Sequence, residues 1–175
     1  MITGDFSSNQ VLSRIAEKRY DIVFHLAAVP RVEYSVKNPV SSNEQNVSKT
    51  LALMTACIEN IDRFVFSSSS AIYGDCPGNF PSVENGEFSP SSPYGLQKKI
   101  IEDYCSLYHL LYDLDSVCLR YFNVYGPGQL GDSPYSTAVS AWMDKIFNKL
   151  PLRSDGDGEQ TRDMVCLLYT SDAAD

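Results

Sequence analysis

A serine, a tyrosine and a lysine in two short segments are the residues whose types and spacing best suit catalysis. Ser69 lies in the run Phe64-Val-Phe-Ser-Ser-Ser-Ser-Ala-Ile-Tyr-Gly74, and Tyr94 and Lys98 form a Tyr-x-x-x-Lys pair. A tyrosine hydroxyl titrates at about pH 10, so it needs a nearby positive charge to act as a base at neutral pH. Lys98 can supply that charge, while Ser69 hydrogen-bonds the same substrate oxygen. The pattern therefore points to hydride-transfer chemistry.

Each part of this pattern has a simpler explanation when it is taken alone. The serines at 67–70 suit a polar loop or helix cap, and a single Tyr-x-x-x-Lys pair is only a hypothesis-grade motif. The surrounding elements favour the chemical interpretation. Phe64-Val-Phe66 is typical of a buried parallel strand, and ligands of open α/β sheets collect where such strands end. Ser92-Pro93 is a helix-start signal, which places the tyrosine and the lysine one turn apart on one helix face.

Strand and helix patterns alternate along the first two thirds of the chain. Residues 21–28 and 116–122 are two further candidates for buried strands, and residues 43–60 and 93–112 carry apolar residues at helical spacing. This alternation predicts right-handed βαβ units in an α/β fold with a doubly wound parallel sheet. After Tyr121 the pattern changes to loops rich in glycine and proline.

That change predicts the start of a second, smaller lobe, with a helix candidate at residues 136–150. We expect the first domain to cover residues 1–121 and part of the second lobe to cover residues 122–165.

Composition excludes several classes of partner. The 175 residues are 43% hydrophobic and carry a net charge of -8 with a pI near 4.7, which argues against a nucleic acid or an anionic membrane as a partner. Five cysteines without a Cys-x-x-Cys pair and two distant histidines predict no metal site. His25 lies in a strand candidate, so we expect a hydrogen-bonded core histidine. The absence of a signal-like start favours a reducing, cytoplasmic setting.

Five segments taken together resemble the extended short-chain dehydrogenase/reductase family, and within it the NAD-dependent epimerases and dehydratases, most of all the UDP-sugar 4-epimerases. These segments are His25-Leu-Ala-Ala28, Ser67-Ser-Ser-Ser-Ala-Ile-Tyr-Gly74, Pro93-Tyr-x-x-x-Lys98, Leu119-Arg-Tyr-Phe-Asn-Val-Tyr-Gly126 and Gly156-Asp-Gly-Glu-Gln-Thr-Arg-Asp163. The resemblance implies a Rossmann-like domain that binds NAD, and a UDP-sugar as substrate.

The same resemblance implies roles for single residues. On the cofactor side it implies that Asp5 contacts the adenine with Phe6 beside it, and that Lys98 holds the nicotinamide ribose. The other residues that it places along the cofactor are Leu26, Ala27, Ala28, Asn46, Ser67, Tyr94 and Phe122. On the substrate side, Ser69 and Tyr94 bind the sugar, Asn123 touches the diphosphate and Arg162 neutralises it, because a planar guanidinium donates two bonds together.

Structural explanations stay open for three of these residues. Asp5 could cap the helix that follows it, Asn46 could lie on a solvated helix face, and Arg162 could pair with Asp163.

The residue two places after Ser69 narrows the reaction. Relatives that dehydrate a sugar carry an acidic residue there to move a second proton, and decarboxylating relatives tend to have glutamate, whereas this chain has Ala71. Without that acid, reversible oxidation at C4 followed by return of the hydride to the other face is the simplest fit. A dehydratase or decarboxylase of the same family is the alternative. A second alternative is a non-catalytic nucleotide-binding protein of the same fold.

The ends of the chain depart from the family. The glycine-rich Gly-x-x-Gly-x-x-Gly turn that holds the dinucleotide phosphates is absent, so we expect a fragment of a longer protein that binds NAD weakly if at all. Residues 166–175 do not fit the family, and we expect a non-native tail without a structural role. Relatives often dimerise through helices that correspond to residues 43–60 and 93–112, which implies a homodimer for the whole protein.

Overall fold

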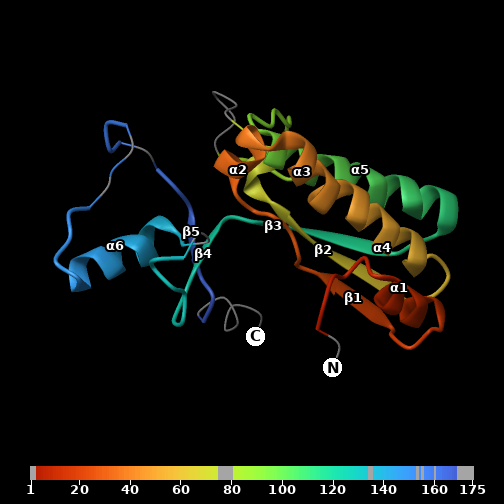
Figure 1. The fold of residues 1–175 in the computed structure, drawn as a ribbon. Coiled ribbons are helices and arrows are strands. Elements are labelled where there is room, and N and C mark those ends of the chain that lie inside the picture. Colours follow the sequence, from red (N-terminus) through yellow and green to blue (C-terminus); the bar gives the residue numbers. More distant parts are fainter. Residues whose placement is uncertain are drawn as a thin grey trace. The chain divides into compact units, whose positions relative to one another are not determined.

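A computed structural model of the chain describes residues 3–74, 81–133, 136–152, 154, 156–159 and 161–168. The chain divides into two compact units, Met1–Arg120 and Tyr121–Asp175. The predicted strands and helices of the first two thirds fall in the first unit (Figure 1). One of the five cysteines, Cys76, and one proline of the loops predicted after Tyr121, Pro134, lie outside the described residues.

The first unit alternates helices with the strands of one sheet, as its sequence pattern predicts. In chain order its elements are α1 (Asn9–Ala16), β1 (Ile22–His25), α2 (Val32–Lys37), α3 (Pro39–Asn43), the π-helical turn η1 (Glu44–Ser48), α4 (Lys49–Cys57), β2 (Arg63–Ser69), the 3₁₀ turn η2 (Ser70–Ile72), α5 (Pro93–Tyr112) and β3 (Ser116–Tyr121). The strand order is β1-β2-β3, and β1 pairs with β2 in parallel, with Ile22 opposite Arg63. The parallel α/β prediction is therefore confirmed.

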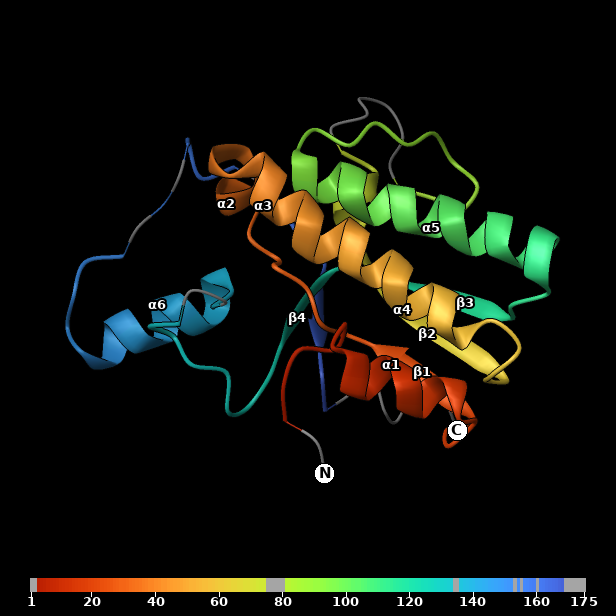
Figure 2. The same cartoon turned by 45° about the vertical axis from the view of Figure 1, so that its right-hand side comes forward.

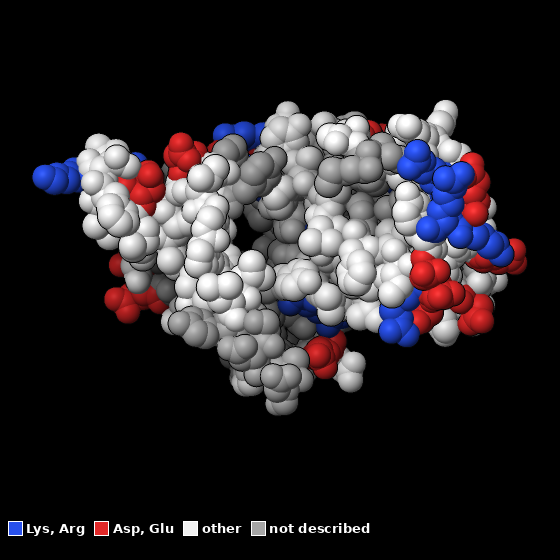
Figure 3. Space-filling model, turned by 90° about the horizontal axis from the view of Figure 1, so that it is seen from below, with Lys and Arg blue, Asp and Glu red and all other residues white. Residues whose placement is uncertain are grey.

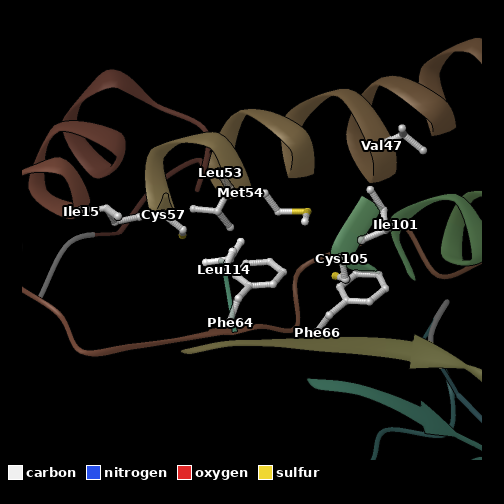
Figure 4. Close-up of a cluster of buried hydrophobic side chains, with 10 residues drawn as sticks. All are labelled: Ile15, Val47, Leu53, Met54, Cys57, Phe64, Phe66, Ile101, Cys105 and Leu114. Carbon is white, nitrogen blue, oxygen red and sulfur yellow. The ribbon is translucent and has the colours of Figure 1, made fainter. Parts of the chain in front are cut away.

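The core of this unit lies between its helices and the sheet. α4 and α5 run side by side in both ribbon views, and α1 packs against α4 (Figures 1 and 2). Their apolar side chains meet Phe64 and Phe66 of β2, which are almost fully buried (Figure 4). Met54 and Ile101, which the helical spacing places on core-facing stripes, are completely buried in this cluster. Burial of each such side chain stabilises the fold by roughly 1.5–3 kcal/mol.

β1 is less buried than its sequence predicts. Only His25 of its four residues is fully buried, whereas Ile22 and Phe24 are 46% and 66% exposed. Successive side chains of a strand point to opposite faces, so Val23 and His25 share one face while Ile22 and Phe24 share the other. The expectation of a strand buried on both faces is wrong for β1, because the described helix contacts cover only the face of His25.

His25 is a core residue, as predicted. It is 4% exposed, its Nε2 lies 2.9 Å from Thr50 Oγ1, and its ring packs against Phe6, Phe64 and Phe66. Burial, with a smaller contribution from the Lys98 charge, lowers the pKa of His25 to about 4. The imidazole is therefore neutral at physiological pH and contributes packing and one hydrogen bond.

The second unit begins as β3 ends. It holds β4 (Asn123–Tyr125), α6 (Ala138–Phe147) and β5 (Met164–Cys166), and β4 pairs with β5 in parallel with Asn123 opposite Met164. The tail expected to have no structural role starts inside this pair: Cys166 ends β5, and Leu167 N donates to the Tyr125 oxygen at 2.9 Å. Strand pairing uses backbone groups, so it continues past residue 166, where the tail is expected to begin.

Three findings bear on partners and metals. None of the described helices is long and apolar enough to cross a membrane. On the face shown in Figure 3, acidic and basic side chains lie next to each other at the right-hand side of the view. No group of three or more possible metal ligands occurs within the described residues.

Candidate active site

Ser69 stands at the carboxyl end of β2, where its sequence places it. Phe64, Phe66 and Ser68 are buried on one face of this strand. Ser67 and Ser69 lie on the opposite face and are only half-buried. The Ser69 hydroxyl accepts a hydrogen bond from Ala71 N at 3.2 Å and caps the short turn η2. The serine is thus held at a strand end next to the start of α5.

Tyr94 and Lys98 lie on the first turns of α5. Pro93 occupies the first helical position, and the Ser92 hydroxyl accepts from Gly95 N at 3.1 Å, so the predicted helix start is confirmed. Tyr94 and Lys98 are 9% and 4% exposed. Spacing of four residues places both side chains on one helix face, which is turned into the protein.

The lysine ammonium connects this helix to β2. Lys98 Nζ donates to the Ser67 carbonyl oxygen at 2.6 Å and lies 4.6 Å from the centre of the Phe66 ring. It lies 5.8 Å from the centre of the Tyr94 ring. The three predicted catalytic residues therefore meet at the carboxyl end of β2, although they are distant in sequence.

The pKa values of Tyr94 and Lys98 differ in part from the expectation that the lysine charge favours the ionised tyrosine. Burial raises the pKa of Tyr94 above its ordinary value, and a hydrogen bond with the Ser69 side chain opposes this rise. Burial also lowers the pKa of Lys98 to about 8. Desolvation thus disfavours the charged form of both groups. The positive charge of Lys98 does not lower the pKa of Tyr94 here, because burial dominates for both.

The predicted cofactor segment follows β1 directly. Leu26 is 67% exposed, Ala27 is exposed and Ala28 is half-buried, so their backbone is accessible to a ligand. Phe6 packs beside the end of this strand, with its ring centre 4.7 Å from that of His25. The carboxyl ends of the paired strands β1 and β2 thus bring this segment and the serines to the same edge of the sheet.

Asp5 does not cap α1, because Ser8 is the N-cap residue of that helix. Its carboxylate instead accepts from Ser7 N at 2.8 Å and from Lys49 Nζ at 2.5 Å. The hydrogen bond with Lys49, followed by those with Ser7, holds the pKa of Asp5 well below its usual range. Contact of this carboxylate with adenine remains a prediction.

Asn46 is buried, so the alternative of a solvated helix face is wrong. It is 4% exposed and belongs to η1, where one extra residue per turn interrupts the helix. Such π-helical turns are rare and frequently occur at functional sites. Asn46 Oδ1 accepts from Val29 N at 2.7 Å, so the side chain supports the segment that follows β1.

Phe122, Asn123 and Arg162 belong to the second unit. Asn123 starts β4, and its Nδ2 donates to the Asp163 oxygen at 3.0 Å. Arg162 directly precedes that residue, so the β4–β5 pair brings Asn123 and Arg162 to one end. Arg162 is exposed and donates to the Thr161 oxygen at 2.7 Å. Phe122 is half-buried between β3 and β4. Their predicted roles toward cofactor and diphosphate remain predictions.

Sequence reasoning missed a buried ion pair behind the serine strand. Glu102 on α5 pairs with Arg120 of β3 at 2.8 Å and accepts from the Ser68 hydroxyl at 2.5 Å. Arg120 also donates to the Tyr73 hydroxyl at 3.1 Å and to the Glu84 carbonyl oxygen at 2.7 Å. Arg120 lies in the quoted segment Leu119–Gly126, but nothing in that segment points to Glu102, so only the three-dimensional contacts reveal the pair. It ties α5 to the strand residue next to Ser69.

Gly95 is a second residue that sequence reasoning missed. It follows Tyr94 at the point where α5 approaches η2, and a Cβ atom there would lie 2.5 Å from the Ala71 carbonyl oxygen and 3.2 Å from Pro90 Cβ. Only a residue without a side chain permits this approach, which keeps Ser69 and Tyr94 close together.

We therefore expect Gly95→Ala to destabilise the chain by about 1–3 kcal/mol, because the backbone of η2 must move away. Urea unfolding checks this value. Gly4→Ala is the matched control, since a Cβ at Gly4 meets nothing within 4 Å, and we expect a change below about 0.5 kcal/mol. Equal effects of the two substitutions would contradict the steric argument.

The residues at the strand ends fit the nicotinamide half of NAD. A lysine ammonium has three hydrogen-bond donors. Lys98 uses one of them for the Ser67 carbonyl oxygen, which leaves two donors for the two hydroxyls of a ribose. The small side chains of Ala27 and Ala28 leave the adjacent backbone accessible. The sequence holds no glycine-rich turn for the diphosphate. Lys98, Tyr94 and the segment after β1 are thus the groups that would hold the cofactor.

Comparisons with known proteins agree with this site. A family model described as "NAD dependent epimerase/dehydratase family" matches residues 1–175. The chain is 33% identical over 186 residues to a UDP-glucose 4-epimerase of Azospirillum brasilense, covering 100% of this chain and 53% of that protein. It is 30% identical over 161 residues to a UDP-N-acetyl-alpha-D-glucosaminuronate decarboxylase of Bacillus cytotoxicus, covering 90% and 49%.

A similar solved structure is that of UDP-N-acetylglucosamine 4-epimerase from Methanobrevibacter ruminantium M1 in complex with UDP-N-acetylmuramic acid. The TM-score is 0.87 at 39% identity, over 98% of this chain and 55% of that chain. The chain thus spans about half the length of the relatives that it matches. NAD is the cofactor of this family, as the sequence predicts. With its parallel sheet and its ordered motifs, the chain belongs to the NAD-dependent epimerase/dehydratase family.

Proposed function

We propose that the whole protein containing this chain is a UDP-sugar 4-epimerase, acting on UDP-glucose and UDP-galactose or on their N-acetylated forms. The observation that carries the proposal is the meeting of Ser69, Tyr94 and Lys98 at the end of β2 with Ala71 in the adjacent turn. The likeness to two 4-epimerases supports it.

In this proposal Tyr94 accepts the proton of the sugar 4-hydroxyl, and Ser69 holds the same oxygen. The hydrogen bond with Ser69 already favours the ionised phenol, and the Lys98 ammonium is the nearby cation of the site. NAD, held by Lys98 and the segment after β1, would supply reversible acceptance of a hydride from C4. The sugar would turn in its 4-keto form, so that the hydride returns to the opposite face of C4 and Tyr94 gives the proton back to the oxygen.

The absence of an acid at the position two places after Ser69 favours epimerisation over elimination. Dehydration needs a second acid or base to move a proton, and Ala71 occupies the position where relatives hold it. Glu102 is the buried carboxylate of the neighbouring helix, but Arg120 and the Ser68 hydroxyl engage its oxygens. The decarboxylase relative keeps the alternative reaction worth testing.

Substrate anchoring is proposed for the second unit. A sugar that turns during the reaction must stay attached through its nucleotide, and the diphosphate carries the charge for that attachment. Asn123 and Arg162 lie at one end of the β4–β5 pair and offer an amide and a guanidinium, which suit phosphate oxygens.

The test uses the complete protein, purified and assayed for bound NAD and for interconversion of UDP-glucose with UDP-galactose, with and without N-acetyl groups. We expect interconversion of at least one pair without release of water or carbon dioxide. Release of water or carbon dioxide from the substrate would assign the protein to the dehydratases or decarboxylases. No turnover of any nucleotide sugar would refute the proposal that the protein is an enzyme.

We also propose a homodimer in a cytoplasmic setting. Exposed apolar residues on α5, including Leu96, Leu107 and Leu110, at 50%, 43% and 79% exposure, support a helix-mediated contact. Cys57, Cys105, Cys118 and Cys166 are free thiols, which suits a reducing compartment.

A further inference from the structure

Four polar side chains lie buried between α5 and the helices that precede it, and we call them the amide seam. They are Ser35 of α2, Ser42 of α3, Asn46 of η1 and Gln97 of α5, which are 0%, 0%, 4% and 4% exposed. Burying polar groups costs free energy unless they are hydrogen-bonded. All four have hydrogen-bond partners: Ser42, Asn46 and Gln97 bond to one another, and Ser35 bonds to the backbone of Val32 and Tyr94.

Gln97 is the member of the seam on the catalytic helix, between Tyr94 and Lys98. Its Oε1 accepts from Ser42 Oγ at 2.8 Å and from Asn46 Nδ2 at 2.9 Å. A carbonyl oxygen has two lone pairs, so this one atom is fully used. Two helix segments before β2 therefore fix the position of α5 through one amide oxygen.

Asn46 extends the seam to the segment after β1. Its Oδ1 accepts from Val29 N at 2.7 Å, and its Nδ2 donates to the Val29 oxygen at 3.1 Å. Val29 directly follows Leu26–Ala28, the backbone proposed to run along the dinucleotide. A continuous chain of hydrogen bonds thus leads from that segment through Asn46 to Gln97.

Ser35 adds a second attachment of α5. Its hydroxyl accepts from Tyr94 N at 3.1 Å and donates to the Val32 carbonyl oxygen at 2.7 Å. The backbone of the tyrosine is therefore held from α2, while Gln97 is held one turn further along the helix.

We propose that Gln97 is a positioning residue that fixes the segment Leu26–Val29 and the Tyr94–Lys98 pair relative to each other, an inference that rests on the proposed function. Directional hydrogen bonds specify one arrangement, whereas apolar packing tolerates small shifts. Hydride transfer demands such an arrangement, because a displacement of about 1 Å at a reacting centre can cost about 100-fold in rate.

The first test follows the amide hydrogen exchange of Val29 in the 175-residue chain by NMR, before and after Gln97→Met. Methionine has a similar length but accepts no such bond from Ser42 or Asn46, so Asn46 gains freedom. We expect Val29 to exchange about 10-fold faster while the amides of β2 keep their rates. A uniform increase across β2 as well would show a general loss of stability and overturn the positioning role.

The second test measures turnover by the complete protein. We expect Gln97→Met to lower kcat about 10-fold or more and to change the KM for the nucleotide sugar less than about two-fold, since Asn123 and Arg162 are untouched. Unchanged kcat in a wild type that turns over would overturn the proposal. If the wild type has no activity, the proposed function fails, and the Val29 exchange alone decides the structural link.

Gln10→Met is the matched control, because Gln10 is an exposed residue of α1. We expect neither Val29 exchange nor kcat to change. Should Gln97→Met not fold, Gln97→Asn keeps an amide that is one methylene too short to reach both donors. Normal Val29 exchange in that variant would overturn the proposal, and faster exchange confined to Val29 would support it.

Discussion

Tyr94→Phe in the complete protein is expected to lower kcat about 1,000-fold or more while leaving most of the NAD bound, because Lys98 and the segment after β1 would still hold it. The substitution removes the oxygen that we propose accepts the substrate proton, and general acid–base catalysis contributes about 100- to 10,000-fold in enzymes. The ring keeps its buried place on α5. Only the hydrogen bond with Ser69 is lost, which costs the fold about 1 kcal/mol.

Turnover of UDP-glucose and the absorbance of bound NAD are the measurements. Tyr112→Phe is the matched control, since Tyr112 lies at the other end of the same helix and is 46% exposed. We expect the control to keep its full rate. A Tyr94→Phe protein with wild-type kcat would remove Tyr94 from the mechanism, whatever its NAD content.

Local signals explain why much of the site arrangement could be predicted from the sequence. A capping serine and a proline mark the start of α5, so the one-turn spacing of Tyr94 and Lys98 follows directly. The run that ends at Ser69 alternates buried and half-buried residues up to the strand end. These features depend on neighbours a few residues away, and the structure confirms their geometry.

The remaining features depend on contacts between distant residues. Gln97 meets Asn46 and Ser42 across separations of 51 and 55 residues, and Glu102 meets Arg120 across a strand–helix packing. Each of these residues looks like an ordinary polar position of a helix or strand. The π-helical turn that presents Asn46 has no sequence signature either. The exposure of one face of β1 could not be predicted either, because both faces of the strand carry apolar side chains and these do not show which face a helix covers.

The buried position of Lys98 costs stability, and its proposed role at the site is a reason for that cost. Lys98 is 4% exposed, and burial lowers its pKa from 10.5 to about 8. At pH 7 the lysine is charged in both the folded and the unfolded chain, so the folded state carries the cost of a buried charge. A shift of this size corresponds to about 3 kcal/mol, since one pKa unit is about 1.4 kcal/mol. Functional residues commonly carry such costs.

We therefore expect Lys98→Met to stabilise the 175-residue chain by about 2 kcal/mol at pH 7, after about 1 kcal/mol is deducted for the lost bond to Ser67. Between pH 8 and pH 10.5 the unfolded lysine keeps a proton that the folded one has released. The stability of the wild type accordingly rises with pH across this range, and the advantage of the variant shrinks. Urea unfolding at pH 7 and pH 10 measures both values.

Lys37→Met is the matched control, because Lys37 forms an exposed pair with Glu33, and surface pairs contribute about 0–1 kcal/mol. In the complete protein Lys98→Met should reduce turnover about 100-fold or more, since the donors proposed for the cofactor ribose are lost and the nicotinamide is no longer held in place for hydride transfer. A variant that is less stable than the wild type at pH 7 would show that the Ser67 bond outweighs the buried charge. A variant that is more stable and fully active would instead leave this lysine without a catalytic reason for its burial.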